Sequence, residues 1–377
     1  MKIPVNEPVI APESKRAVLE ALETGWISSA GPAILRFEQE FAAFVGMKHG
    51  IAVMNGTAAL HLALASLRIG PGDEVIVPDF TMIATVTAVM YTGATPVFVD
   101  VDRETFAMDP MQVALSVTPR TKAILPVHLY GHSADMDPIL AIARKHELAV
   151  VEDAAEVHGA TYKGKQCGSM GLMNCFSFYA NKLITTGEGG MVVTNDDALA
   201  ARAKCLRDLA HSPEKRFVHT DLGFNYRMTN LQAALGVGQL AHLDEYVQKK
   251  QWMARRYSEE LSSIRGLRLP ITKDYATNVY WMYAVLVEDA CGITRDELRS
   301  RLLERGIDTR DFFYPCHRQP FLSTHPQAKT SFPISEDIAA RGFYLPSGLA
   351  LTEEQLSAVC TAVRDITSER YTLPTLP

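Results

Sequence analysis

The sequence has little of what would place the protein in a membrane or on nucleic acid. No uninterrupted apolar stretch reaches the roughly 18 residues that a membrane-spanning helix needs, and the first residues lack the apolar core of a signal peptide. The net charge is −6 and no long run of Lys and Arg is present. We therefore expect neither nucleic acid nor an anionic membrane surface as a partner.

Cysteines are also few and scattered. The 377 residues include six, and none forms a CxxC pair or a His/Cys cluster with zinc spacing. This pattern is typical of reduced, packed thiols, so we expect a cytoplasmic protein. Because His128, His132 and His158 do not share metal-ligand spacing either, no metal site is predicted.

What the chain does contain is an alternation of short apolar strands and amphipathic helices. Strands are expected at 74–78, 95–100, 123–127, 149–151, 175–178 and 191–194, and helices at 12–24, 34–44, 57–67, 83–92 and 138–146. Such alternation predicts a mostly parallel α/β sheet. Strands this apolar are expected to be covered by helices on both faces.

A second part of the chain begins near Thr229. One long helix or two are expected over 230–261, a strand over 281–287, and helices over 294–305 and 352–366. We expect a large α/β domain, with the N-terminal segment, over residues 1–240, and a small C-terminal α/β domain over residues 241–377. The overall composition is ordinary for a soluble globular protein.

Lys182 lies in a glycine-punctuated loop between the predicted strands 175–178 and 191–194. Upstream, the strand 149–151 leads directly into Glu152 and Asp153. Pyridoxal phosphate (PLP) needs such a pair, a lysine for an imine with its aldehyde and an acid for its pyridine nitrogen. Taken singly, a loop lysine is usually a surface charge, and an Asp after a strand often caps the next helix.

Four segments occur in the order found in one enzyme family. They are Asn55–His61, Glu152–Ala155, Ser177–Gly190 and Gly223–Met228. Together they resemble the PLP-dependent sugar-nucleotide aminotransferases of the DegT/DnrJ/StrS type, over nearly the whole chain. The resemblance implies PLP fold type I (aspartate-aminotransferase-like), PLP as cofactor, a sugar nucleotide and glutamate as substrates, and a homodimer with shared active sites.

The resemblance also implies roles around the cofactor ring. Lys182 would bind PLP and later act as the base for proton transfer, and Asp153 would pair with the pyridinium nitrogen. Glu156 matches the residue beside the ring, where many relatives have glutamine. Met82 stands where relatives usually have an aromatic side chain against the cofactor. A thioether can also pack on an aromatic face, but a core methionine is an equal alternative.

The cofactor phosphate needs N–H groups and hydroxyls. Gly56 and Thr57 begin a predicted helix, whose free N–H groups and dipole favour an anion. Taken alone, this Gly-Thr pair also describes an ordinary helix start. Ser177 matches the second hydroxyl donor of the family, and Asn225 matches a residue that the neighbouring subunit supplies to the phosphate.

Five further residues resemble substrate contacts. Trp26, Ser28 and Ser29 match a segment that borders the sugar-nucleotide site in relatives. Arg227 is a candidate for an anionic group, with a salt bridge at the surface or dimer interface as the alternative. His317 lies in an aromatic turn that resembles a segment near the active site, although a histidine beside a proline is often structural.

Within the family, the chain most resembles the GDP-perosamine synthases, through Trp26–Ser29 and Val127–Gly131. This implies amination of GDP-4-keto-6-deoxymannose to GDP-perosamine for a polysaccharide. Alternatives are a UDP-, dTDP- or CMP-linked keto-sugar, a PLP enzyme acting on free amino acids, and a non-catalytic PLP-fold regulatory protein. The C3-dehydratase branch has histidine in place of Lys182, which argues against that activity. A regulatory role would predict a DNA-binding appendage or loss of the lysine, and the sequence has neither.

Overall fold

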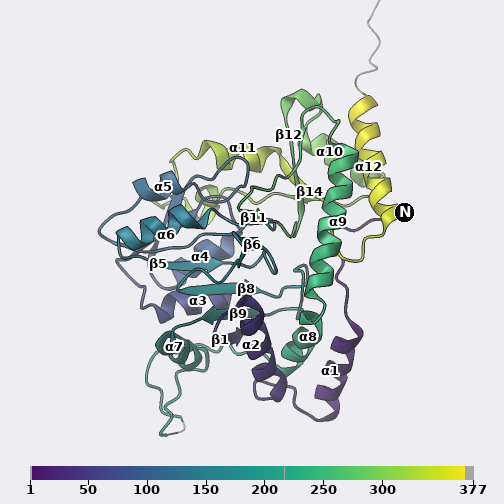
Figure 1. Cartoon of the computed structure of the whole chain (residues 1–377). Coiled ribbons are helices and arrows are strands. Elements are labelled where there is room, and N and C mark those ends of the chain that lie inside the picture. Colours follow the sequence, from purple (N-terminus) through teal and green to yellow (C-terminus); the bar gives the residue numbers. More distant parts are fainter. Residues whose placement is uncertain (1, 216, 370–377) are drawn as a thin grey trace, which may run out of the picture.

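The computed structural model describes residues 2–215 and 217–369, and Figure 1 shows a large unit built on one sheet, with a smaller unit beside it. The strands of the large sheet are β1 (His49–Val53), β2 (Glu74–Pro78), β3 (Thr95–Val99), β4 (Thr121–Ile124), β5 (Ala149–Asp153), β8 (Met173–Ser177) and β9 (Gly190–Thr194). Their order is β1-β9-β8-β5-β4-β2-β3. All neighbours are parallel except for β9, which runs antiparallel to both β1 and β8. The mostly parallel α/β sheet is confirmed.

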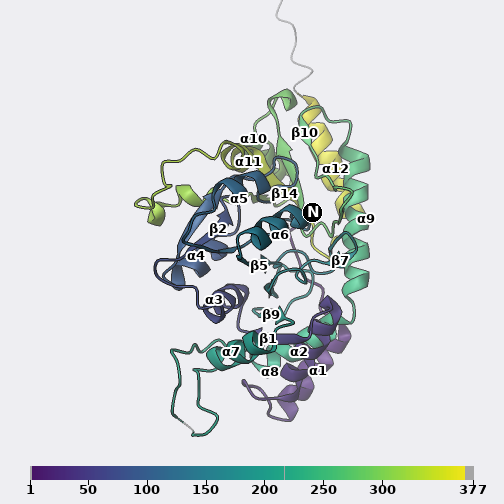
Figure 2. The same ribbon diagram turned by 60° about the vertical axis from the view of Figure 1, so that its left-hand side comes forward.

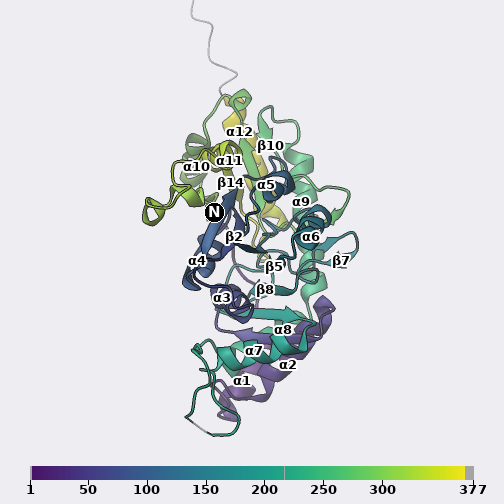
Figure 3. The ribbon, with the colours of Figure 1, turned by 90° about the vertical axis from the view of Figure 1, so that its left-hand side faces the viewer.

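Helices cover this sheet because most residues of its strands are apolar. They are α2 (Pro32–Val45), α3 (Gly56–Ser66), α4 (Ile83–Tyr91), α5 (Pro110–Leu115), α6 (Met136–Lys145) and α7 (Asp197–Arg207). Figures 2 and 3 show α4 and α6 on opposite sides of the sheet. Every residue of β2 and β8 is buried, as expected for strands covered on both faces.

The smaller unit has its own antiparallel sheet and apolar core. Its sheet runs β10 (Leu267–Arg268), β12 (Tyr283–Val287), β14 (Gly342–Leu345), β13 (Arg310–Asp311). The helices around it are α9 (Leu243–Leu261), α10 (Arg295–Glu304), α11 (Pro333–Arg341) and α12 (Glu353–Ser368), with the short helices η1 (Asp289–Cys291), η2 (Cys316–Arg318) and η3 (Pro320–Leu322). Ile3 is buried in this second core, and its N–H donates to Gly306 O at 2.8 Å. The chain around Ile3 therefore packs on the smaller unit.

Several contacts join the units, two of which involve whole elements. A small sheet pairs β11 (Ala276–Thr277) with β6 (Thr161–Tyr162), which pairs with β7 (Lys165–Gln166). The expected helix over 230–261 is two helices, α8 (Asn230–Leu240) and α9, and α8 packs on α1 (Pro12–Glu23) and α2. The break between α8 and α9 lies where we placed the division between domains, and that division stays a prediction.

Threonine side chains cap the starts of two helices, α10 and α12. Thr294 and Thr352 each accept a hydrogen bond from the N–H three residues later, which satisfies an otherwise free donor. The strand expected over 281–287 begins only at Tyr283, so Trp281 lies outside the strand. Within the described residues, no helix is both long and apolar enough to span a membrane.

Candidate active site

The carboxyl ends of the parallel strands meet at one edge of the large sheet. Asp153 is the last residue of β5 and Ser177 is the last residue of β8, and the two strands are paired. In open α/β sheets this edge is where ligands bind. A cavity of about 490 Å³ lies here. Among the residues that line it are seven predicted from the sequence: Gly56, Thr57, Met82, Asp153, Glu156, Ser177 and Lys182.

Lys182 is held by the loop between β8 and β9. Phe178 N–H donates to Gly189 O at 2.8 Å, and Lys182 N–H donates to Tyr179 O at 2.9 Å. The Lys182 side chain is only 10% exposed, and its Nζ lies 3.7 Å from Glu156 Oε1. Burial lowers the pKa of Lys182, against the opposing effect of the nearby carboxylates. The amine therefore loses its proton more readily than an exposed lysine does.

The two carboxyl groups of the cavity are both buried. Glu156 Oε2 accepts from Tyr130 N–H at 2.8 Å, and burial raises the pKa of Glu156 to about 7 even with Lys182 beside it. Asp153 accepts from Thr85 Oγ1 at 2.8 Å and from Ala155 N–H at 3.2 Å, and burial raises its pKa as well. A buried carboxylate with uncharged hydrogen-bond donors can hold a cationic N–H, which is what a pyridinium nitrogen presents.

The start of α3 favours an anion, whereas the buried carboxylates favour a cation. Asn55 Oδ1 caps the helix by accepting from Ala58 N–H at 2.8 Å. A Cβ atom placed on Gly56 would lie only 2.8 Å from Ser177 Cβ, so glycine lets this backbone approach the end of β8. First-turn N–H groups together with the hydroxyls of Thr57 and Ser177 suit a phosphate. We call the first turn of α3, with Thr57 and Ser177, the phosphate cradle. The Lys182 amine, the two carboxylates and this phosphate cradle fit the aldehyde, the ring nitrogen and the phosphate of PLP.

Met82 occupies the position expected from the sequence. It directly precedes α4, is half exposed, and lines the cavity. Its thioether is available to pack against a ring bound there. The contact with the cofactor stays a prediction.

Asn225 and Arg227 lie outside the cavity of their own chain. Arg227 donates to Asn225 Oδ1 at 2.8 Å and forms an ion pair with Asp208 at 2.9 Å. The backbone of this segment is joined to the end of β1, since Met54 N–H donates to Tyr226 O at 2.8 Å. The two side chains are therefore fixed on the surface beside the start of α3.

Trp26, Ser28 and Ser29 also lie outside this cavity, in the segment between α1 and α2. Asn230 at the start of α8 holds the segment: its Nδ2 donates to Trp26 O at 2.7 Å, and its N–H donates to Ser28 O at 2.6 Å. The Trp26 side chain remains exposed. A role for these residues in binding substrate stays a prediction.

His317 is buried and is not among the residues that line the cavity. Its N–H and its Nδ1 bond the two carboxylate oxygens of Asp79, both at 2.8 Å. This pairing attaches the aromatic turn to the end of β2. It is a structural role, and contact of His317 with substrate stays a prediction. Phe313 from the same turn does line the cavity.

Some lining residues were not foreseen from the sequence. The smaller unit supplies Trp281 and Tyr344, while Thr85 supports Asp153 from α4. The aromatic residues stand in no motif at fixed spacing from Lys182. Packing of the smaller unit on the large sheet brings them there, and only the three-dimensional structure shows it.

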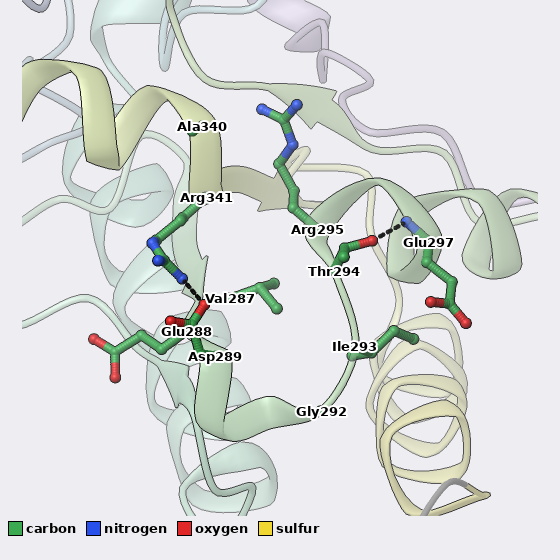
Figure 4. A pocket seen from close by; sticks show the side chains of 10 residues that line it. All are labelled: Val287, Glu288, Asp289, Gly292, Ile293, Thr294, Arg295, Glu297, Ala340 and Arg341. Atoms are coloured by element: carbon green, nitrogen blue, oxygen red, sulfur yellow. Dashed lines mark hydrogen bonds and ion pairs between the residues drawn. The ribbon is translucent and has the colours of Figure 1, made fainter.

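A second hollow, of about 480 Å³, lies in the smaller unit between β12, α10 and the end of α11 (Figure 4). Its arginines are already paired, Arg341 with Asp289 at 2.6 Å and Arg295 with Asp296 at 2.8 Å. No lysine lines it. The described residues contain no group of three or more His, Cys, Asp or Glu side chains placed to hold a metal ion. This hollow therefore offers no amine for an imine with PLP, whereas the cavity around Lys182 does.

Comparison with known proteins agrees with this geometry. Residues 8–364 match the model of the DegT/DnrJ/EryC1/StrS aminotransferase family. The GDP-perosamine synthase of Caulobacter vibrioides is 46% identical over 369 residues, 97% of this chain and 98% of that protein. The GDP-perosamine synthase of Escherichia coli O157:H7 is 43% identical over 368 residues, 98% and 99% of the two chains. The crystal structure of S. venezuelae DesV superimposes with a TM-score of 0.89 at 41% identity, covering 94% of each chain. The chain therefore belongs to the DegT/DnrJ/EryC1/StrS family of PLP-dependent aminotransferases.

Proposed function

We propose that this aminotransferase moves an amino group from glutamate to carbon 4 of GDP-4-keto-6-deoxymannose, giving GDP-perosamine for a surface polysaccharide. The observation that carries the proposal is the Lys182 amine, held in one cavity with the buried Asp153 and the phosphate cradle of α3. The GDP sugar is supported by the two relatives named GDP-perosamine synthase, which align over nearly their whole length. A cytoplasmic location is supported by six free cysteines.

The side chains of the cavity have different chemical roles in such a reaction. Bound PLP supplies an electron sink for the negative charge that a substrate carbon acquires on losing its proton. Lys182 would hold the cofactor covalently and, once its amine is free, would move a proton at Nζ. Glu156, 3.7 Å away, favours the protonated amine. Asp153 places a negative charge where a ring nitrogen must keep its proton.

A homodimer with shared sites is part of the proposal. Five large apolar side chains are about half exposed along α1, the following segment and α2: Leu19, Leu22, Trp26, Ile27 and Leu35. Exposed apolar side chains concentrated in one part of the chain favour a protein partner, and a second copy with two-fold symmetry is the simplest. Asn225 lies outside its own cavity, as a residue that serves the neighbouring subunit would.

The nucleotide is tested by a panel of keto-sugars with glutamate. We expect kcat/KM for GDP-4-keto-6-deoxymannose to exceed that for UDP- and dTDP-linked 4-keto sugars by at least about tenfold, or about 1.4 kcal/mol of differential transition-state binding. Release of 2-oxoglutarate and the mass of the amino sugar are measured, with Lys182→Ala as background. Equal rates with the other nucleotides would contradict the GDP assignment. A lack of transfer to every keto-sugar, including a 3-keto one, would contradict the proposed function.

Shared sites are tested by mixing two inactive chains. Asn225→Ala and Lys182→Ala chains, unfolded and refolded together, should recover about a quarter of the activity of the unsubstituted protein. The reason is that half the dimers are hybrids and each hybrid has one site with both residues intact. The control mixes Lys182→Ala with the doubly substituted chain, which offers no such site. Hybrids verified by mass spectrometry that stay inactive would argue that Asn225 does not act across the dimer.

Glu156→Gln should make the Lys182 nitrogen less basic. The amide oxygen can still accept from Tyr130 N–H, whereas the charge that raises the pKa of Lys182 is lost. We expect the pH midpoint of the visible absorbance of the bound cofactor to fall by about one unit. Glu188→Gln is the control, because Glu188 lines the same cavity but is exposed to solvent and its charge is screened. An unchanged or raised midpoint in Glu156→Gln would show that Glu156 does not set the charge of Lys182.

A further inference from the structure

Trp281 lies against the reactive amine, although no motif points to it. Its side chain is buried at 3% exposure, and Lys182 Nζ is 3.8 Å from the centre of its ring. Glu156 Oε1 is 3.7 Å from the same nitrogen. The amine thus has both a carboxylate and an aromatic face as close neighbours.

Three contacts fix Trp281 in this position. The indole N–H donates to Asn181 O at 2.8 Å, so the ring is bonded to the residue directly before Lys182. The carbonyl of Trp281 accepts from Lys250 Nζ at 2.6 Å. Lys250 itself is buried in α9 and also donates to Ser347 O. The ring of Tyr130 lies nearly parallel, with centroids 6.3 Å apart and planes at 18°.

The geometry has an electrostatic consequence. The face of an indole ring carries negative charge, and it attracts an ammonium group most strongly where water is excluded. Burial alone favours the neutral form of Lys182. The Trp281 ring acts in the opposite direction, and it does so without adding a charge to the cavity. A base that must alternately accept and release a proton needs such a balance.

We propose that Trp281 is a positioning residue for Lys182, whose indole face binds the ammonium form of the amine and whose N–H fixes the loop that carries it. The inference rests on the proposed role of Lys182 in the reaction. If Trp281 has this role, the smaller unit contributes to the proton affinity of Lys182, which the large sheet carries. Trp281 couples the two units at the reacting nitrogen.

Several other groups face Lys182 and must be kept constant in a test. They are Asp153, Glu156, His158, Tyr179, Glu188 and Tyr344. Burial lowers the pKa of His158 to about 3, so this ring stays neutral at physiological pH. Substitution of Trp281 changes none of these six residues and removes no charge. A change in the proton affinity of Lys182 can then be attributed to the ring itself.

The test compares Trp281→Leu with Trp281→Phe in the protein freed of cofactor. Acetylation of Lys182 by acetic anhydride is measured across pH by peptide mass spectrometry, because only the neutral amine reacts. Trp281→Leu should lower the pH midpoint by about half a unit to one unit. Trp281→Phe keeps an aromatic face and should leave the midpoint within about 0.3 unit. It lacks the bond to Asn181 O, so amide exchange over residues 179–183 should quicken. An unmoved midpoint in Trp281→Leu, or equal shifts in both variants, would overturn the proposal.

Fluorinated tryptophan provides a second form of this test, which does not depend on whether Trp281→Leu folds. In a Trp26→Phe, Trp252→Phe background, Trp281 is the only tryptophan left of the three. Successive fluorine atoms withdraw charge from the ring face with little change in shape, so the midpoint should fall stepwise with fluorine number. A midpoint independent of fluorine number would overturn the proposal. Because the readout is acetylation without cofactor, its failure would leave the aminotransferase assignment standing.

Discussion

The nearly complete burial of the Lys182 amine is the constraint on which the rest of the site depends. An ammonium group taken out of water is costly unless charge or polarisable groups surround it. Here Glu156 lies 3.7 Å from Nζ and the Trp281 ring 3.8 Å. The first follows β5 of the large sheet, and the second precedes β12 of the smaller unit. The amine therefore has its full environment only when the two units are packed together.

The remaining features follow from the direction of the strands. Because β5 and β8 are parallel neighbours, Asp153 and Ser177 emerge at the same edge, where α3 also begins. A buried carboxylate and a helix N-terminus thus line one cavity. They attract opposite charges. PLP, with a cationic ring nitrogen and an anionic phosphate, satisfies both preferences.

Most of the large unit could be predicted from the sequence, because apolar strands and helices alternate in short segments. The resemblance to the aminotransferase family also grouped Lys182, Asp153, Ser177 and Gly56, and the structure brings all four to one cavity. Trp281 could not, because its contact with Lys182 joins distant segments and its sequence context indicated a strand. The Asp79 partner of His317 is equally invisible in the sequence. Long-range pairs depend on how the units pack, which local patterns do not encode.

The account as a whole depends on which amine binds the cofactor. Lys250 is the main alternative lysine for binding the cofactor, because it is also buried and burial lowers its pKa to about 7. Reduction of the cofactor-bound protein with borohydride, followed by digestion and peptide mapping, identifies the tagged lysine directly. The account predicts the phosphopyridoxyl group on Lys182. The group on Lys250, or on any other lysine, would contradict it.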